Sequence, residues 1–374
     1  MNKRDAKHSN SIDSTARDGE AGNSDVGSCP DCEPPSRRRF LTSTCQSVVG
    51  AATLPTLAAV PLLASSAKAA ETAKAPAKVA ETYVQQFYES LSPAQRKLMH
   101  FPFDHEKRSY VANNWHVVEP EVASIGELYT PNQKELLRQI FRSSTTEDGF
   151  ERFQKQMDDD AGGFDNYTCA VFGKPGESKF EWVLTGRHLT MRVDGNSVEN
   201  AAFGGPIFYG HAVTFNKRPD HPGNVWWHQG KLANKVFEAL DGKQREKALI
   251  STKPADDAGT IALKGYGSEI PGLSGAELSS DQRGLLEETL KSLLGMFRES
   301  DVKEATECIK KNGGLEQLHL AYFNHEEADL GKDGVWDCWR VEGPTFAWHF
   351  RGAPHVHVWV NLAHEAGEAE ARRL

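Results

Sequence analysis

The side chains best suited to chemistry lie near the end of the chain, in the stretch HFRGAPHVHVWVN. Side chains of a strand point alternately to its two faces, so His349, His355 and His357 are predicted to share one face of a hairpin that turns at RGAP. Opposed residues on neighbouring strands lie about 5 Å apart, where protonated imidazoles would repel each other. A transition metal such as iron, copper or zinc would hold them together as neutral ligands, so the pattern predicts a metal site.

The apolar residues that alternate with these histidines, such as Trp348 and Val358, are predicted to face the core. The histidines are therefore expected on the opposite, non-core surface. An earlier stretch, GRHLTMRV, places His188 on a strand face, and His188 would supply a further ligand if the two hairpins meet. The alternative is that these histidines bind no metal and are exposed or bonded to backbone groups.

One carboxylate stands close to the predicted hairpin. Glu342 precedes Gly343 and Pro344 and is the best-placed acid for general acid–base catalysis or for metal ligation. A single carboxylate is more often a surface residue or a partner of arginine, and that interpretation stays open. The chain has no GxGxxG after a strand, no GxxxxGK[ST], no HExxH and no GxSxG, which argues against the common nucleotide-binding and hydrolase motifs.

The elements that position these residues begin with a repeated helix-start signal. SPAQR, TPNQK, DGKQR and SSDQR each place Ser, Thr or Asp three residues before Gln. In such a capping box the first side chain accepts a bond from the backbone N–H of the Gln, and the Gln side chain reaches back to the first residue. The four signals predict four helix starts, which we favour over a substrate clamp built from these Gln side chains.

The spacing of these signals predicts an internal duplication. Gln95 and Gln133 are as far apart as Gln244 and Gln282, and a β-rich stretch with hairpin turn signals follows each pair. The predicted class is α+β, with two internally duplicated halves that are each a helical pair followed by an antiparallel β-meander. The predicted boundaries are a first half at 81–215, a connector at 216–231, a second half at 232–362 and a tail at 363–374.

The first 69 residues resemble an export signal. SRRRFLTS is a basic run, an apolar stretch at 48–64 follows it, and AKA at 67–69 supplies the small residues of a cleavage site. The arginine run is similar to a twin-arginine signal, which predicts export to the periplasm or cell surface and no stable membrane insertion after cleavage. An uncleaved membrane anchor is the alternative, although two prolines interrupt the apolar stretch.

The formal net charge of the chain is −9, which argues against a nucleic-acid partner because such partners need a basic footprint. A small-molecule substrate is the partner that we expect, and the sequence does not indicate an oligomeric state.

The motifs in their order resemble one known family. LSPAQRKLMHFPFD, YTCAVFGKPGE, TGRHLTMRV, RVEGPTFAWHF and HVHVW look like the proteins grouped as domain of unknown function 3500. The resemblance implies a largely exported bacterial family without a defining activity, and it supports the choice of His188, His355 and His357. Family members tend to carry an acidic residue where His349 stands here.

Together these patterns predict an exported metal-dependent enzyme with a histidine-rich site, in which redox chemistry is favoured over hydrolysis. Redox chemistry is preferred because a zinc hydrolase usually shows a nearby carboxylate base, and Glu342 is the one acid available. The alternatives are a non-catalytic periplasmic metal- or ligand-binding protein and a structural protein in which the histidines are incidental.

Overall fold

The computed structural model describes residues 79–213, 220–252, 254–324 and 333–374, so the predicted leader at 1–69 lies outside the described residues. These residues form one mixed sheet of eleven strands with helices packed on it, and the predicted α+β class is confirmed. None of the helices in the described ranges has both the length and the apolar composition needed to cross a bilayer.

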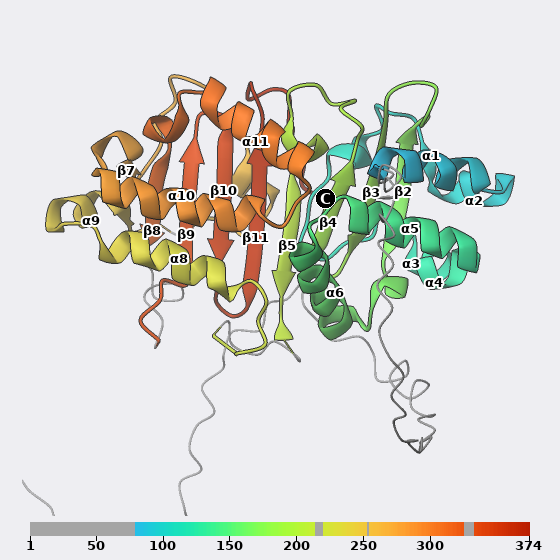
Figure 1. The fold of residues 1–374 in the computed structure, drawn as a ribbon, viewed down its shortest axis with the longest axis horizontal. Coiled ribbons are helices and arrows are strands. Elements are labelled where there is room, and N and C mark those ends of the chain that lie inside the picture. Colours follow the sequence, from blue (N-terminus) through green and yellow to red (C-terminus); the bar gives the residue numbers. More distant parts are fainter. Residues whose placement is uncertain (1–78, 214–219, 253, 325–332) are drawn as a thin grey trace, which may run out of the picture.

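The sheet runs in the order β1-β2-β3-β4-β5-β11-β10-β9-β8-β6, with β7 pairing on β8 as well (Figure 1). The strands are β1 (His100–Phe101), β2 (Thr168–Gly173), β3 (Phe180–Gly186), β4 (Leu189–Val193), β5 (Ile207–His211), β6 (Leu249–Ile250), β7 (Leu273–Ser274), β8 (His319–Phe323), β9 (Cys338–Gly343), β10 (Phe346–Arg351) and β11 (Val356–Leu362). Strands β5 and β11 pair antiparallel in the middle, which joins the earlier strands to the later ones.

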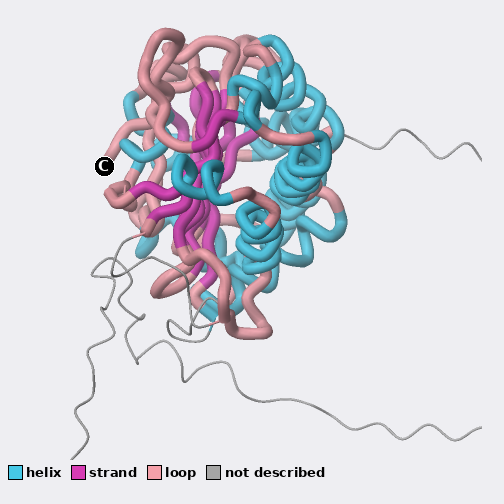
Figure 2. The backbone as a smooth tube through the Cα atoms, turned by 90° about the vertical axis from the view of Figure 1, so that its left-hand side faces the viewer, coloured by secondary structure: helices cyan, strands magenta, loops and turns pink. Residues whose placement is uncertain are grey.

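Most helices cover one face of the sheet, and mainly loops cover the other face (Figures 1 and 2). The α-helices are α1 (Ala80–Ser90), α2 (Pro93–Met99), α3 (Pro120–Ala123), α4 (Ile125–Leu128), α5 (Pro131–Ser143), α6 (Glu147–Ala161), α8 (Trp227–Glu238), α9 (Gly242–Ala248), α10 (Ser280–Leu294) and α11 (Glu299–Lys311). The 3₁₀ helices are η1 (Glu106–Ser109), η2 (Phe164–Asn166), η3 (Ala202–Gly204), η4 (Ala258–Ile261), η5 (Gly275–Glu277) and η6 (Gly314–Gln317).

All four predicted helix starts are confirmed as capping boxes. Ser92, Thr130, Asp241 and Ser279 each accept a bond from the backbone N–H of the Gln three residues later, and that Gln bonds back to the cap. Pro at the first helical position in α2 and α5 costs no hydrogen bond, because that N–H has no partner within a helix. The helix α8 begins inside the segment predicted as a connector at 216–231.

The two faces of the β10–β11 hairpin follow the predicted alternation. The helix-covered face contributes apolar residues to the main core, namely Phe346, Trp348, Phe350, Val356, Val358 and Val360. The opposite face was expected at a non-core surface, and this expectation was wrong. Loops bury it too, around a second small core that contains Phe208, Ala258, Ile261 and Trp359.

The predicted tail at 363–374 packs against earlier parts of the chain. Backbone bonds join Arg372 to Ser109 and Val111, and another joins His364 to Asn200. Ala369 is buried, so this segment contributes to the loop-covered side of the fold.

Candidate metal centre

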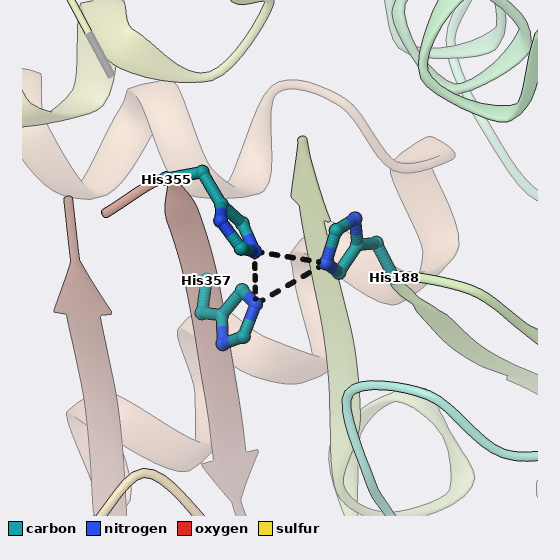
Figure 3. Close-up of side chains that lie close together, drawn as sticks. All are labelled: His188, His355 and His357. Atoms are coloured by element: carbon teal, nitrogen blue, oxygen red, sulfur yellow. Dashed lines mark hydrogen bonds between the residues drawn. The ribbon is translucent and has the colours of Figure 1, made fainter. Parts of the chain in front are cut away.

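Three of the four predicted histidine ligands meet at the centre of the sheet. His188 follows β3, whereas His355 and His357 lie at the start of β11, and all three side chains are fully buried. Their Nε2 atoms point at one another (Figure 3). The distances between these atoms are 3.2 Å for His188–His355, 3.2 Å for His188–His357 and 2.9 Å for His355–His357.

The spacing of these nitrogens fits a metal ion. An ion with tetrahedral geometry and nitrogen ligands at about 2.0–2.1 Å keeps those nitrogens roughly 3.3 Å apart. The three Nε2 atoms form a nearly equilateral triangle of that size, and it is the one group of three or more potential ligands found in the described residues. We refer to these three rings as the histidine triangle. Three protein ligands on one side leave a further coordination position available.

Two of the rings are oriented by carboxylates that sequence analysis did not identify. His188 Nδ1 lies 2.8 Å from Asp160 Oδ2, and His357 Nδ1 lies 2.9 Å from Asp256 Oδ2. An ionised carboxylate only accepts hydrogen bonds, so when Asp160 and Asp256 are ionised each bonded Nδ1 carries the proton and each Nε2 presents a lone pair. Two lone pairs that face each other at 3.2 Å, as on Nε2 of His188 and Nε2 of His357, repel, and a cation between them would remove that repulsion. A carboxylate on the far nitrogen is also the usual second contact of a metal-binding histidine.

Asp256 is itself held by three donors. It accepts bonds from the ring of His357, from the indole Nε1 of Trp359 at 2.8 Å and from the guanidinium of Arg351 at 2.9 Å. Burial alone would raise the pKa of Asp256, but His357 and Arg351 hold that pKa well below its usual range. The carboxylate therefore stays ionised and keeps the ring of His357 in one orientation.

The environment keeps all three imidazoles neutral. Burial lowers the pKa of His188 well below its usual value, and the nearby charge of Arg187 adds to this effect. Burial and the two neighbouring rings lower the pKa of His355 in the same direction, and burial with Arg351 lowers the pKa of His357 to about 3. Burial raises the pKa of Asp160 to about 7. Neutral imidazole is the form that binds a metal.

His188 occupies a strained position in a tight turn. Gly186 pairs with Leu189, so Arg187 and His188 form the two-residue loop between β3 and β4, not part of a strand as predicted. The φ angle of His188 is 56°, in the left-handed region that favours Gly or Asn. Its backbone N–H donates to the carbonyl of Asn113, and its carbonyl accepts from the Gln156 side chain. A strained histidine fixed from both sides is typical of a functional residue.

Gly210 lets β5 pass directly beside the rings. It pairs with His357 across the β5–β11 ladder, and its N–H donates to the carbonyl of His188. A Cβ atom here would collide with the carbonyl oxygen of Val356, and it would lie 3.3 Å from Cδ2 of His357 and 3.5 Å from Cβ of His188. The absence of a side chain at this position therefore allows the two ring-bearing segments to approach.

The structure corrects the prediction that His349 joins this group. His357 pairs with Arg351, whereas His349 pairs with Trp359 two residues further along the hairpin. The His349 ring shares the predicted face but turns toward β9, where its Nε2 lies 4.0 Å from Sγ of Cys338. The extra distance along the strand, together with this turn of the ring, keeps it out of the histidine triangle.

Glu342 is also separate from the triangle. It lies on β9, two strands away from β11, and opposes Ala347 of β10. Its buried carboxylate forms ion pairs with Lys264 at 3.1 Å and with Arg340 at 3.3 Å. This arrangement matches the alternative interpretation, in which the acid is a partner of basic side chains, and Glu342 does not stand beside the three rings.

A cavity of about 540 Å³ adjoins the site on the side of Asp256. Trp359, Asn113 and Asn114 contribute to its wall, and Asp257 with Arg373 lies at its edge. Asp256 therefore contacts His357 on one side and faces the cavity on the other. The volume is in the range of small-molecule sites.

One of the two missed carboxylates left a signal in the sequence. Asp160 is the last of three consecutive aspartates in the final turn of α6, where the helix dipole disfavours negative charge. That unfavourable placement points to a role outside the helix. Asp256 lies in an irregular segment before η4, and no local pattern marks it.

Comparison with known proteins places the chain by family. A family model described as a protein of unknown function, DUF3500, matches residues 73–364, a span that contains the whole histidine triangle. This match confirms the resemblance drawn from the motifs. No curated protein and no solved structure matches the chain.

Proposed function

The chain belongs to the DUF3500 family, and because that family's description assigns no activity, we propose a function from the geometry of the histidine triangle. The protein is an exported metal-dependent enzyme. It holds one ion of iron, copper or zinc with His188, His355 and His357 and acts on a small-molecule substrate. The observation that carries this proposal is the convergence of three buried Nε2 atoms, two of them on rings whose Nδ1 atoms contact buried carboxylates.

Different residues of the chain would orient the metal ligands and bring them together. A bound ion would supply Lewis-acid or redox chemistry at its open position. Asp160 and Asp256 orient two of the ligands, and Gly210 allows β5 to bring the first part of the chain close to β11. The buried rings exclude water from the ligand nitrogens.

Redox chemistry is favoured over hydrolysis within this proposal. Hydrolysis at zinc commonly uses a carboxylate base near the ion. Asp160 and Asp256 are each engaged by a ring nitrogen, and Glu342 is paired with Lys264 and Arg340. These three acids are therefore committed to other contacts, and a redox-active iron or copper is the preferred ion.

A second candidate is a non-catalytic periplasmic protein that binds a metal or another ligand. The observation that favours it is the complete burial of the three rings, which suits a closed and saturated site. Exchange separates the two candidates: an ion whose spectrum changes when azide or oxygen is added supports an enzyme, whereas an inert ion supports the binding protein.

The metal content of the full chain purified from a periplasmic fraction is the decisive measurement. We expect one transition-metal ion per chain, and loss of that ion in the His355→Gln and His357→Gln variants. The His349→Gln variant is the matched control, because it changes a buried histidine on the same hairpin that lies outside the triangle, and it should keep its ion. A native protein without a stoichiometric transition metal would refute the enzyme and the metal-binding candidates together.

Export by the twin-arginine route to the periplasm or cell surface belongs to the same proposal. It is supported by the arginine run and the apolar stretch in residues 1–69. Twin-arginine export carries folded proteins, which suits a protein that acquires its ion before it leaves the cytoplasm. Substitution of Arg37, Arg38 and Arg39 by Lys, followed by fractionation of the cells, tests the route.

We also propose that the fold consists of two duplicated halves. Gln95 and Gln133 exchange side-chain bonds at 2.8 and 3.1 Å, and Gln244 and Gln282 do the same at 3.0 and 2.8 Å. The strand pairing is consistent with this, since β1 pairs in parallel with β2, β6 pairs in parallel with β8, and each pair precedes an antiparallel meander. The histidine triangle then takes ligands from both halves.

A further inference from the structure

The charged groups around the histidine triangle cancel before any ion binds. The side chains that act on the rings most directly are two guanidiniums and two carboxylates: Arg187, Arg351, Asp160 and Asp256. Arg351 pairs with Asp256 at 2.9 Å, and Arg187 acts on Asp160 as well as on His188. With both carboxylates ionised, the two positive and two negative charges sum to zero.

Two ion pairs lie further outward from these four groups. Lys155 pairs with Asp159 at 2.7 Å, and Asp159 accepts a bond from the buried ring of His211, whose pKa burial lowers. At the cavity edge, Arg373 pairs with Asp257 at 3.1 Å. These two outer ion pairs add no net charge to the four groups beside the rings.

A divalent ion changes this balance by two charges. The three ligands are neutral imidazoles, so none of them compensates the ion, and all three are fully buried. An uncompensated charge in a water-poor interior is costly, and proteins avoid it by pairing the charge. The carboxylates next to the rings already have basic partners, so the missing negative charge has to come from outside the chain.

We propose that the ligand completing this centre is an oxyanion, and that the substrate binds through an anionic oxygen group such as a carboxylate. This inference rests on the proposed metal centre and adds the chemical class of its substrate. A neutral amide or alcohol of the same size would leave the buried site with two excess positive charges. We therefore expect the site to select anionic over neutral ligands of similar shape.

The test uses the full chain loaded with Co²⁺, whose visible spectrum reports its ligands, and titrates it with acetate and with the neutral isostere acetamide. We expect acetate to change the spectrum with an affinity at least tenfold higher than that of acetamide. Equal affinities, or a preference for acetamide, would overturn the inference while leaving the metal centre intact. Failure of Co²⁺ to bind at all would instead refute the proposed function.

Two arginine variants test the electrostatic basis. Arg351→Gln removes one positive charge beside the rings and should weaken acetate binding to the Co²⁺-loaded protein about tenfold, with little change for acetamide. Arg340→Gln is the matched control, because Arg340 is a buried arginine on the neighbouring strand β9 that pairs with Glu342. Its acetate affinity should stay that of the unmodified protein. A larger loss in Arg340→Gln than in Arg351→Gln would contradict the charge argument.

Discussion

The rings of His188 and His357 are each oriented by a carboxylate that bonds Nδ1, the nitrogen that points away from the centre of the histidine triangle. Asp256 illustrates this, since it fixes His357 while Arg351 and Trp359 fix Asp256. The orientation of one ring therefore depends on residues that are not members of the triangle. Asp160 has the same relation to His188 and also accepts a bond from the backbone N–H of Ala212.

We expect Asp256→Asn to reduce metal affinity about 10- to 100-fold without changing the one-to-one stoichiometry, because the second contact of a ligating histidine has an effect of this size. Titration with a competing chelator measures it. Asp257→Asn is the control: Asp257 caps η4 by accepting from the N–H of Gly259, and Asn retains that cap. Equal losses in the two variants would show that Asp256 acts only on the local fold.

Strand alternation and the H-x-H spacing are local signals, and they brought His355 and His357 together in the prediction. His188 was chosen on a strand assignment that the structure replaces with a turn. Sequence reasoning also grouped His349 with them, whereas the structure places that ring toward β9, because face alternation fixes the side of a strand but not the direction in which a ring turns. It missed Asp160 and Asp256, since contacts between distant segments leave no periodic pattern. The strained turn at His188 was likewise not predicted, because the sequence Gly-Arg-His-Leu is equally compatible with the start of a strand.

At the scale of elements, the β5–β11 pair decides whether the site exists. These two strands are the contact between the earlier and the later part of the sheet, and the triangle spans it. The close approach depends on Gly210, whose missing side chain leaves space for Val356 and for the ring of His357.

We expect Gly210→Ala to lower the free energy of unfolding by about 1–3 kcal/mol, because the added methyl group would collide with backbone in a packed region. Metal affinity should fall in parallel, since the rings move apart. Gly242→Ala is the control: a Cβ there meets nothing within 4 Å, and the change should be neutral or stabilising by about 1 kcal/mol or less. Chemical denaturation with a metal titration measures both. Unchanged metal affinity in Gly210→Ala would refute the role of the close approach.

The paired glutamines support a prediction about helix starts. Gln133→Ala and Gln282→Ala each leave a partner amide and a backbone carbonyl without their bonds, at a cost of about 1–3 kcal/mol. The loss should be larger for Gln133, because the first glutamine pair is buried and the second is half-buried. Half-buried Gln139 serves as the control, because its side chain bonds only exposed Glu135, and Gln139→Ala should stay within about 0.5 kcal/mol. The reverse order of the two losses in urea unfolding would contradict this account.

These elements were the most predictable part of the molecule. Capping boxes depend on a few adjacent residues, so all four were found from sequence, and the hydrophobic alternation of β10 and β11 gave the core face. The burial of the other face was not predicted, because it results from loops such as the one before η4 and from residues near the end of the chain. Irregular segments carry no period from which their position follows.

At the scale of the whole molecule, a bound ion should act as a cross-link between distant segments. A ligand at about a thousand times its dissociation constant stabilises the fold by roughly 4 kcal/mol. We expect a chelator to lower the melting temperature of the metal-loaded protein by several degrees. The His357→Gln variant should show no such shift, and an equal shift in that variant would mean that the chelator acts elsewhere.

A second whole-molecule effect concerns pH. Burial and the nearby charges of Asp194 and Asp301 raise the pKa of Glu304 to about 7. Unfolded Glu ionises near pH 4.3, so between that value and about pH 7 the folded state holds a proton that the unfolded state has released. Stability from this group is present at low pH and is lost as the pH rises through that window.

We therefore expect Glu304→Gln, which is neutral at every pH, to gain stability relative to the unmodified protein as the pH rises from 5 to 8. Comparing the two proteins at each pH by urea unfolding cancels the contributions of the groups that do not interact with Glu304, including the histidines of the triangle. A difference in stability that stays constant across this range would contradict the raised pKa.

The central place of β11 has a consequence for synthesis. This strand follows every other strand of the sheet in the chain, yet it lies between β5 and β10. The ribosome makes about 5–20 residues per second, so the edge of β5 that pairs with β11 stays unpaired for on the order of ten seconds while the intervening residues are made. An open edge of that kind recruits other strands. The nascent protein therefore has its greatest need of a chaperone during this interval. A chain released before Val356 would leave β5 and β10 each with one unpaired strand edge.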